Sequence, residues 1–177
     1  MSLPVEPQAA TPELFRSVLS NFATGVTIIT ARDGEEIVGM SANSFTSVSL
    51  EPPLVAFCAA RSSTTYPRIR RAGGFCVNVL ADDQAELAKL FSRLGVDRFA
   101  EISWGPAPSG AAILEGVLAW VDCTITAEHP AGDHVIVVGE VRYLGAAPAR
   151  SPLLFFQSSY GMEEATVPLG GTPPPTS

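Results

Sequence analysis

Basic residues are scarce in this chain: 11 Lys and Arg stand against 18 Asp and Glu, which gives a formal net charge of −7. A nucleic-acid-binding protein needs a basic surface, so the composition argues against that class but leaves room for a local anion site. The chain also lacks an apolar run of about eighteen residues, which argues against a transmembrane helix. Its first residues lack the basic and apolar regions of a secretion signal.

Cysteine and histidine are equally sparse. Cys58, Cys76 and Cys123 each lie in an apolar, strand-like run, and no two stand close enough to form half of a zinc site. They are predicted to be buried, reduced thiols, which favours the cytoplasm and no bound metal. The two histidines, His129 and His134, flank one turn. No Ser–His–Asp order with a nucleophile elbow, no P-loop and no dinucleotide-binding glycine motif is present, so hydrolase, NTPase and Rossmann functions have no support.

The remaining sequence predicts one domain. Residues 1–11 are polar and contain proline, which predicts a flexible leader, and residues 167–177 are rich in Pro, Gly and Thr, which predicts a disordered tail. Residues 12–166 are long enough for a sizeable core, and 46% of the chain is hydrophobic.

Within this domain, apolar patterning predicts more strands than helices. Helices are expected at 12–22, at 65–71 and from a cap at Asp82 or Asp83 to Leu94. Turns are expected at 32–35 and 130–133, and a loop at 98–110. Strands are expected at 26–30, 37–41, 54–59, 75–80, 117–128, 134–144 and 153–156. Short, closely spaced strands with few helices indicate a mainly β domain, an antiparallel barrel with flanking helices.

The most informative stretch runs from Gly39 to Val55. It contains an apolar strand, then a run of Ser, Asn and Thr, then a second apolar strand entered through Pro52 and Pro53. Small polar residues bury little apolar surface, and their polar atoms need partners. We therefore expect this run to line a site for a ligand with many hydrogen-bonding groups. Because acid–base residues are few, a cofactor is expected to supply the chemistry.

Several ordered motifs give the chain a resemblance to a known family. They are residues 23–30 (ATGVTIIT), 39–53, 61–64 (RSST), 75–80 (FCVNVL), 97–99 (DRF), 132–134 (GDH), 138–141 (VGEV) and 159–161 (SYG). Over residues 12–161 the chain resembles the flavin reductase-like proteins with the FMN-binding split-barrel fold. These are short-chain NAD(P)H:flavin oxidoreductases that serve two-component monooxygenases. The resemblance thus implies an antiparallel split β-barrel and reduction of FMN or FAD.

The resemblance also implies a flavin site. The segment of Ser41, Ala42, Asn43 and Ser44 would contact the ribityl chain and the ring edge, with help from donors at Thr46 and Ser49. The loop of Arg61, Ser62, Ser63 and Thr64 would bind the flavin phosphate, and a helix start favours an anion there. The other interpretation of this loop is a helix cap with an exposed arginine. Ser41 stands where the family commonly has Thr, which keeps the hydroxyl group.

A second set of residues would complete the site. By resemblance, Gly132, Asp133 and His134 would bind nicotinamide, although this triplet also suits an ordinary hairpin turn. Tyr160 would close over the flavin, and Phe99 would wall its dimethylbenzene or adenine side, whereas Phe91 better fits an apolar core. Residues 156–161 contain less glycine than many family members, which puts the lid over the nicotinamide in doubt.

The function implied by the resemblance is hydride transfer from NADH or NADPH to flavin N5, with the reduced flavin passing to a partner monooxygenase. No basic cluster marks a 2′-phosphate site, which favours NADH. The family forms homodimers, so a homodimer is expected. Two alternatives stay open: a flavin-binding electron-transfer or storage module, and a flavin-dependent reductase that acts directly on another small substrate.

Overall fold

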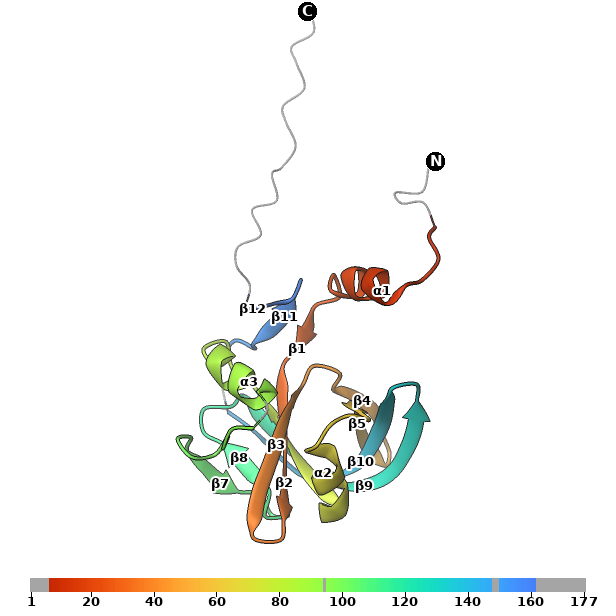
Figure 1. Cartoon of the computed structure of the whole chain (residues 1–177). Coiled ribbons are helices and arrows are strands. Elements are labelled where there is room, and N and C mark those ends of the chain that lie inside the picture. Colours follow the sequence, from red (N-terminus) through yellow and green to blue (C-terminus); the bar gives the residue numbers. More distant parts are fainter. Residues whose placement is uncertain (1–6, 94, 148–149, 162–177) are drawn as a thin grey trace, which may run out of the picture.

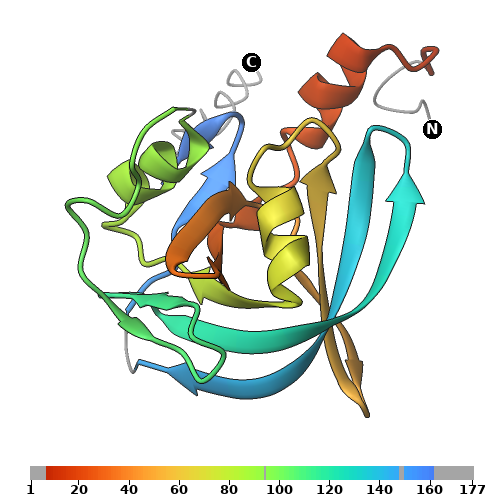
Figure 2. The same ribbon diagram turned by 60° about the horizontal axis from the view of Figure 1, so that its bottom comes forward.

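A seven-stranded antiparallel sheet forms the body of the protein. The computed structural model describes residues 7–93, 95–147 and 150–161. The strand order is β3-β2-β6-β9-β10-β5-β4, so that β3 and β4 are the two edges. The sheet curls strongly, with the long β9 and β10 running around one side (Figure 1, Figure 2). Its strands are β2 (Thr27–Asp33), β3 (Glu36–Ala42), β4 (Thr46–Leu50), β5 (Pro53–Ala60), β6 (Gly74–Val79), β9 (Ala119–Ala131) and β10 (His134–Ala146).

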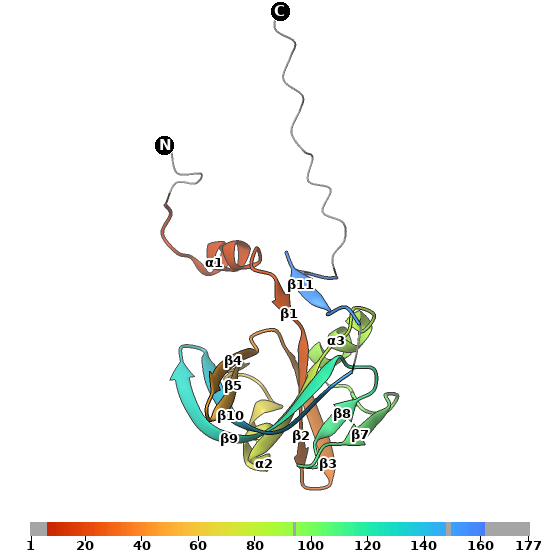
Figure 3. The ribbon, with the colours of Figure 1, turned by 180° about the vertical axis from the view of Figure 1, so that it is seen from behind.

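Smaller elements cover this sheet. The segments β1 (Thr24–Gly25), β11 (Leu154–Phe156) and β12 (Ser159–Tyr160) form a three-stranded sheet, and β7 (Trp104–Pro106) pairs with β8 (Ala112–Leu114). The helices are α1 (Pro12–Leu19), α2 (Tyr66–Ala72) and α3 (Ala85–Ser92). In both Figure 1 and Figure 3, α1 lies outside the barrel, beside the β1–β11 sheet. None of the helices found in the described residues has the length and apolarity to cross a membrane.

The core has two main parts because side chains alternate across the strands. Ile29 belongs to a cluster inside the curl, where the rings of Phe57 and Phe75 meet edge to face with centroids 5.1 Å apart. Its neighbour Ile28 points the other way, into a cluster under α3. Gly139 is required opposite Phe75, because a Cβ there would lie 2.5 Å from the ring.

A buried asparagine links three strands beside the cluster under α3. Asn78 is fully buried, and its amide nitrogen donates to the carbonyl groups of Ile28 at 3.3 Å and Ala112 at 3.0 Å. Its Oδ1 accepts the N–H of Leu114 at 2.8 Å. The side chain therefore joins β6 to β2 and β8, and its own polar atoms are satisfied in the buried site.

The expected strands are all present, but several boundaries were wrong. The helix predicted to reach Phe22 ends at Leu19. The helix predicted to start at an aspartate cap begins after Gln84, whose side-chain oxygen accepts the N–H of Ala81. Asp83 forms an ion pair with Arg150 instead of capping the helix. The loop predicted at 98–110 contains β7, whose partner β8 lies beyond a turn. In the hairpin predicted to turn at 130–133, β9 continues to Ala131.

The hydroxyl-rich run was also more regular than predicted, because residues 46–50 form the edge strand β4. The tail predicted at 167–177 lies outside the described residues, as do residues 1–6 of the leader and 162–166 of the domain. The proposed domain limits therefore stay predictions.

Candidate functional site

The end of β3 opens into a small cavity, which we call the Ser41 hollow. Ser41, Ala42 and Asn43 line it together with Tyr160 from β12. The cavity volume is about 200 Å³. Val26, Ser92 and Phe155 complete the lining. The structure thus brings the predicted ring-binding segment together with the predicted closing aromatic.

The four residues of this segment differ in what their side chains already bind. Ser44 is fully committed, since its hydroxyl accepts the N–H of Cys58 at 2.9 Å and lies 3.3 Å from the carbonyl of the same residue. It fixes the segment to β5. For Ser41 and Asn43, no side-chain hydrogen bond is found in the described part of the chain. These two groups remain available to a ligand.

Thr46 and Ser49 lie farther along, on the edge strand β4. Thr46 is opposite Ala56 and Ser49 is opposite Leu54 in the register with β5. Thr46 is exposed and its hydroxyl donates to the carbonyl of Ser47 at 3.2 Å. Neither residue lines the Ser41 hollow, so their contact with a flavin stays a prediction.

The loop that leads into α2 uses one of its hydroxyl groups for the fold. Ser63 Oγ accepts the N–H groups of Thr65 at 3.3 Å and Tyr66 at 3.1 Å. The helix starts at Tyr66, and its first donors are therefore already bonded. The helix thus begins one residue after the predicted start at residue 65, and Ser63 caps it. For an anion, the loop offers the N–H groups and hydroxyls of Ser62 and Thr64 and the side chain of Arg61, for which no partners are found among the described residues.

The turn between β9 and β10 lies against this loop. The N–H of Arg61 donates to the carbonyl of Asp133 at 2.9 Å, and His134 is opposite Ala60 in the sheet. Gly132 has φ +62°, the left-handed conformation that favours glycine. The turn and the α2 loop lie at the same end of the molecule in Figure 2. The predicted nicotinamide residues and phosphate residues are therefore neighbours.

The side chains of this turn interact with each other. His134 Nδ1 lies 2.7 Å from Asp133 Oδ1, and both side chains are exposed. The hydrogen bond from His134 lowers the pKa of the Asp133 carboxyl below its usual range. The carboxylate thus orients the imidazole ring at the rim of the site.

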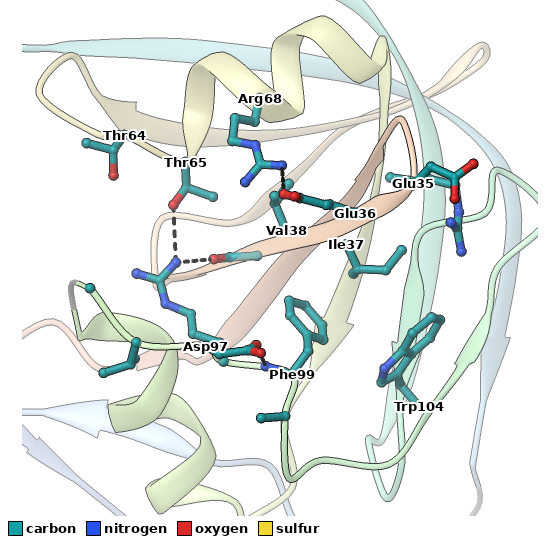
Figure 4. A pocket seen from close by; sticks show the side chains of 16 residues that line it. Glu35, Glu36, Ile37, Val38, Thr64, Thr65, Arg68, Asp97, Phe99 and Trp104 are labelled. Carbon is teal, nitrogen blue, oxygen red and sulfur yellow. Dashed lines mark hydrogen bonds and ion pairs between the residues drawn. The ribbon is translucent and has the colours of Figure 1, made fainter.

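A second and larger cavity lies between α2 and residues 95–104, over β3 (Figure 4). We call it the Trp104 groove; its volume is about 1040 Å³. Phe99 lies here, packed edge to face between Phe91 at 5.2 Å and Trp104 at 6.3 Å. Phe99 therefore lines the Trp104 groove and not the Ser41 hollow. Thr64, which belongs to the α2 loop, also lines this groove. Phe91 is buried in the core, as the sequence favoured.

Charged side chains border this groove. Arg68 pairs with Asp33 at 2.7 Å and with Glu36 at 2.5 Å. Hydrogen bonds from Arg71 and Arg68 hold the pKa of Asp33 at about 2, well below its usual range. Arg98 donates to the carbonyl of Gly39 at 2.8 Å and lies 3.2 Å from Thr65 Oγ1, and burial lowers its pKa.

Comparison with known proteins matches this arrangement to one family. The sequence profile described as "Flavin reductase like domain" matches residues 19–163. The chain belongs to the flavin reductase-like family. It is 47% identical to the "Flavin reductase" of Pseudomonas putida, over 86% of this chain and 91% of that protein. It is 44% identical to the "Flavin-dependent monooxygenase, reductase subunit HsaB" of Mycobacterium tuberculosis, over 89% and 86% of the two chains.

Solved structures of the family confirm the fold. The NADH:FAD oxidoreductase SgcE6 of Streptomyces globisporus C-1027, in complex with NAD and FAD fragments, superimposes with a TM-score of 0.83 at 35% identity. The match covers 91% of this chain and 99% of that one. Together with the curled antiparallel sheet, this agreement confirms the predicted split barrel with flanking helices.

The donors in the hollow fit a flavin, the ligand after which the family is named. Its ring edge carries carbonyl and nitrogen acceptors, and Ser41 and Asn43 are uncommitted, uncharged donors on one wall of a small cavity. Tyr160 adds an aromatic ring to the lining. This set is suited to binding and orienting a ring, and none of the lining residues is Asp, Glu, His, Lys or Cys.

The cysteines fit a structural role in this flavin reductase-like fold. All three are free thiols, and burial raises the pKa of Cys76 and brings that of Cys123 to about 12. Both are therefore poor nucleophiles at neutral pH. In the described residues, no three His, Cys, Asp or Glu side chains gather as a metal site would require.

Sequence reasoning missed part of the lining. Phe155 and Val26 reach the hollow because β1 pairs with β11, and Thr24 on β1 is opposite Phe155 on β11, far away in the sequence. Arg98 was noted only as part of the motif at 97–99, whereas its side chain bonds the carbonyl of Gly39 on β3 and Thr65 at the start of α2. A short-range pattern does not reveal contacts of this separation.

Proposed function

We propose that this flavin reductase transfers a hydride from NADH or NADPH to N5 of FMN or FAD and passes the reduced flavin to a separate monooxygenase. The observation that carries the proposal is that three segments approach the end of β5. Ser44, next to the Ser41 hollow, bonds Cys58 on β5, and Arg61 of the α2 loop bonds Asp133 in the turn before His134. Relatives at 44% identity are named reductase subunits of a flavin-dependent monooxygenase, which supports the partner.

The flavin supplies the redox chemistry, and the chain supplies position and charge stabilisation. Ser41 and Asn43 would donate to the polar edge of the ring, where negative charge develops on reduction. Donors fixed in place before the reaction stabilise such charge without reorganisation. Ser44 holds this segment against β5 through Cys58 and therefore acts as a positioning residue.

The second coenzyme would approach from the turn. Gly132 lacks a Cβ and leaves open space above the backbone, and His134 can stack on or hydrogen-bond the nicotinamide half. Holding two rings in contact contributes most of the catalysis, because hydride transfer needs no side-chain base. Of the two coenzymes, we propose NADH. We also propose a cytoplasmic location, because the three cysteines are free thiols.

The test is a spectrophotometric assay with each pairing of NADH or NADPH with FMN or FAD. Loss of the nicotinamide absorbance band that depends on added flavin supports the proposal. If no pairing is turned over and flavin stays bound through gel filtration, the chain is a storage or electron-transfer module instead. A reductase of another small substrate would oxidise NADH only when that substrate is present.

Replacing His134 by Ala tests the nicotinamide site. We expect the KM for NADH to rise about five- to tenfold, the worth of one modest contact, with the flavin KM unchanged. His129→Ala is the matched control, because this second histidine lies on β9 in the third residue pair from the turn and should change neither constant. Equal changes in both KM values would assign His134 to hairpin structure alone.

We also propose that the protein forms a homodimer through α1 and the turn after it. The helix buries none of its residues, and Phe15, Val18, Leu19 and Phe22 are between 47% and 70% exposed at helical spacing. An apolar stripe of this kind marks an interaction surface. A second copy of this chain is the expected partner.

Phe15→Glu should therefore convert a dimer into a monomer in light scattering, while Ser17→Glu on the polar side of the same helix should not. A wild-type protein that is monomeric and fully active would contradict the dimer.

A further inference from the structure

Tyr160 lies on a hairpin that has little support of its own. Within the described chain, β12 contains two residues and pairs only with β11, as the outer strand of the small sheet. The hairpin has two residue pairs, Phe155 with Tyr160 and Phe156 with Ser159. The ring of Tyr160 packs on that of Phe155 at a centroid distance of 5.2 Å. Strands this short are marginal in water, so the position of Tyr160 depends on what holds the hairpin.

The turn of this hairpin is formed by residues that do not favour it. Gln157 has φ +47° and Ser158 has φ +64°, and they are the only non-glycine residues with positive φ in the described part of the chain. Two-residue hairpin turns in which both φ values are positive strongly prefer Asn and Gly. A residue with a longer side chain keeps this conformation when the surrounding structure fixes it. The turn therefore needs a partner outside the hairpin.

The end of α1 is this partner. The N–H of Gln157 donates to the carbonyl of Ser20 at 2.9 Å, and its side-chain Nε2 donates to Asn21 Oδ1 at 3.0 Å. The amide nitrogen of Asn21 in turn donates to the carbonyls of Ser17 at 3.0 Å and Val18 at 3.2 Å, in the last turn of the helix. Asn21 thus bonds α1 on one side and the hairpin on the other. Figure 1 and Figure 3 both show α1 beside the small sheet.

We infer that Gln157 is a positioning residue for the flavin ring: by fixing the turn to α1, it holds Tyr160 in the lining of the Ser41 hollow. The inference rests on the proposed function, which places the flavin ring in this hollow. Gln157 does not line the hollow itself, so its effect must pass through Tyr160. Riboflavin, FMN and FAD share the same ring. Loss of the Gln157 side chain should therefore weaken the binding of all three by the same factor.

Replacing Gln157 by Gly tests this role. The change removes the side-chain bond to Asn21, while glycine adopts a positive φ readily and keeps the backbone bond to Ser20. We expect the Kd for each of the three flavins, measured by titration of flavin fluorescence without NADH, to rise about three- to fivefold, the contribution of one hydrogen bond. Ser158→Gly is the matched control. It adds the same flexibility one position later, Ser158 has no bond to α1 in the described residues, and each Kd should stay unchanged.

Two double variants show through which residues Gln157 acts. Tyr160→Ala should itself weaken flavin binding about tenfold, and in that protein Gln157→Gly should have almost no further effect, because the ring that it positions is gone. Asn21→Ala should weaken flavin binding as Gln157→Gly does. The two changes together should have no larger effect than one, since both remove the same bond. The KM for NADH at saturating flavin should stay unchanged in Gln157→Gly.

An equal rise in Kd for Gln157→Gly and Ser158→Gly would assign the effect to flexibility of the turn. An undiminished effect in the Tyr160→Ala protein would show that Gln157 does not act through that ring. Either result would overturn the inference, as would unchanged Kd values in Gln157→Gly or a rise for FMN without one for riboflavin. Flavin-dependent oxidation of NADH by the wild-type protein tests the proposed function separately, so that this function can hold where the role of Gln157 fails.

Discussion

Asn78→Leu is expected to lower the free energy of unfolding by about 2–3 kcal/mol, since leaving a buried polar group unpaired costs roughly 1–3 kcal/mol. The substitution keeps a similar volume but leaves the N–H of Leu114 without its partner in the fully buried site, and it removes one of the two donors to the carbonyl of Ala112, which keeps the hydroxyl of Thr30. A loss of this size is a large share of the stability of an ordinary domain. Urea unfolding followed by circular dichroism, at one fixed protein concentration, measures it.

Asn43→Leu is the matched control for this experiment. Asn43 is exposed, and none of its side-chain hydrogen bonds is found within the described residues. We expect its replacement to change the unfolding free energy by less than about 0.5 kcal/mol, as is usual for surface positions, while weakening flavin binding. A stable Asn78→Leu variant, or an unstable Asn43→Leu variant, would show that the polar groups of the two sites have been assigned the wrong roles.

This pair of asparagines also shows what the sequence could and could not predict about the fold. Asn43 stands in the polar run between two strands, whereas Asn78 lies in an apolar run that correctly predicted β6. The bonds of Asn78 to β8 depend on a strand that short-range patterning missed, because β8 has only three residues and pairs with β7, which lies in the predicted loop at 98–110. The predicted strands were those with continuous apolar runs, whereas β1, β4, β7, β8 and β12 are short segments defined by their partners.

The site was predicted in outline for a similar reason. The polar run after Gly39 was predicted to line a ligand site because polar atoms need partners; three of its residues do line a cavity, and the ligand stays a prediction. The sequence does not show which hydroxyl groups the backbone will use. Ser44 bonds Cys58 and Ser63 bonds the start of α2, so these two are structural, although they have the same chemistry as Ser41 and Ser62. Which of these hydroxyl groups is structural depends on which residues lie next to β5 and its end, and the pairing of the whole sheet determines this.

Arg61→Ala is expected to raise the KM for FMN about thirtyfold while leaving that for riboflavin unchanged, since a hydrogen bond to a charged group contributes about 1.5–3 kcal/mol. Arg61 begins the α2 loop, its backbone N–H is fixed to Asp133 at 2.9 Å, and its side chain has no carboxylate partner in the described residues. A phosphate is the charge that this guanidinium lacks, and riboflavin has no phosphate.

The backbone bond survives the substitution, so the loop should keep its shape and the effect should come from the lost charge. Arg142→Ala is the control: this guanidinium pairs with Glu140 at 3.0 Å on β10, and its removal should change neither KM. The effect of Arg61→Ala should also shrink as salt is added, because Arg61 is exposed and its interaction is screened. Equal changes for FMN and riboflavin would mean that Arg61 supports the shape of the loop. No change for either would leave it an exposed arginine beside a helix cap, the alternative that the sequence left open.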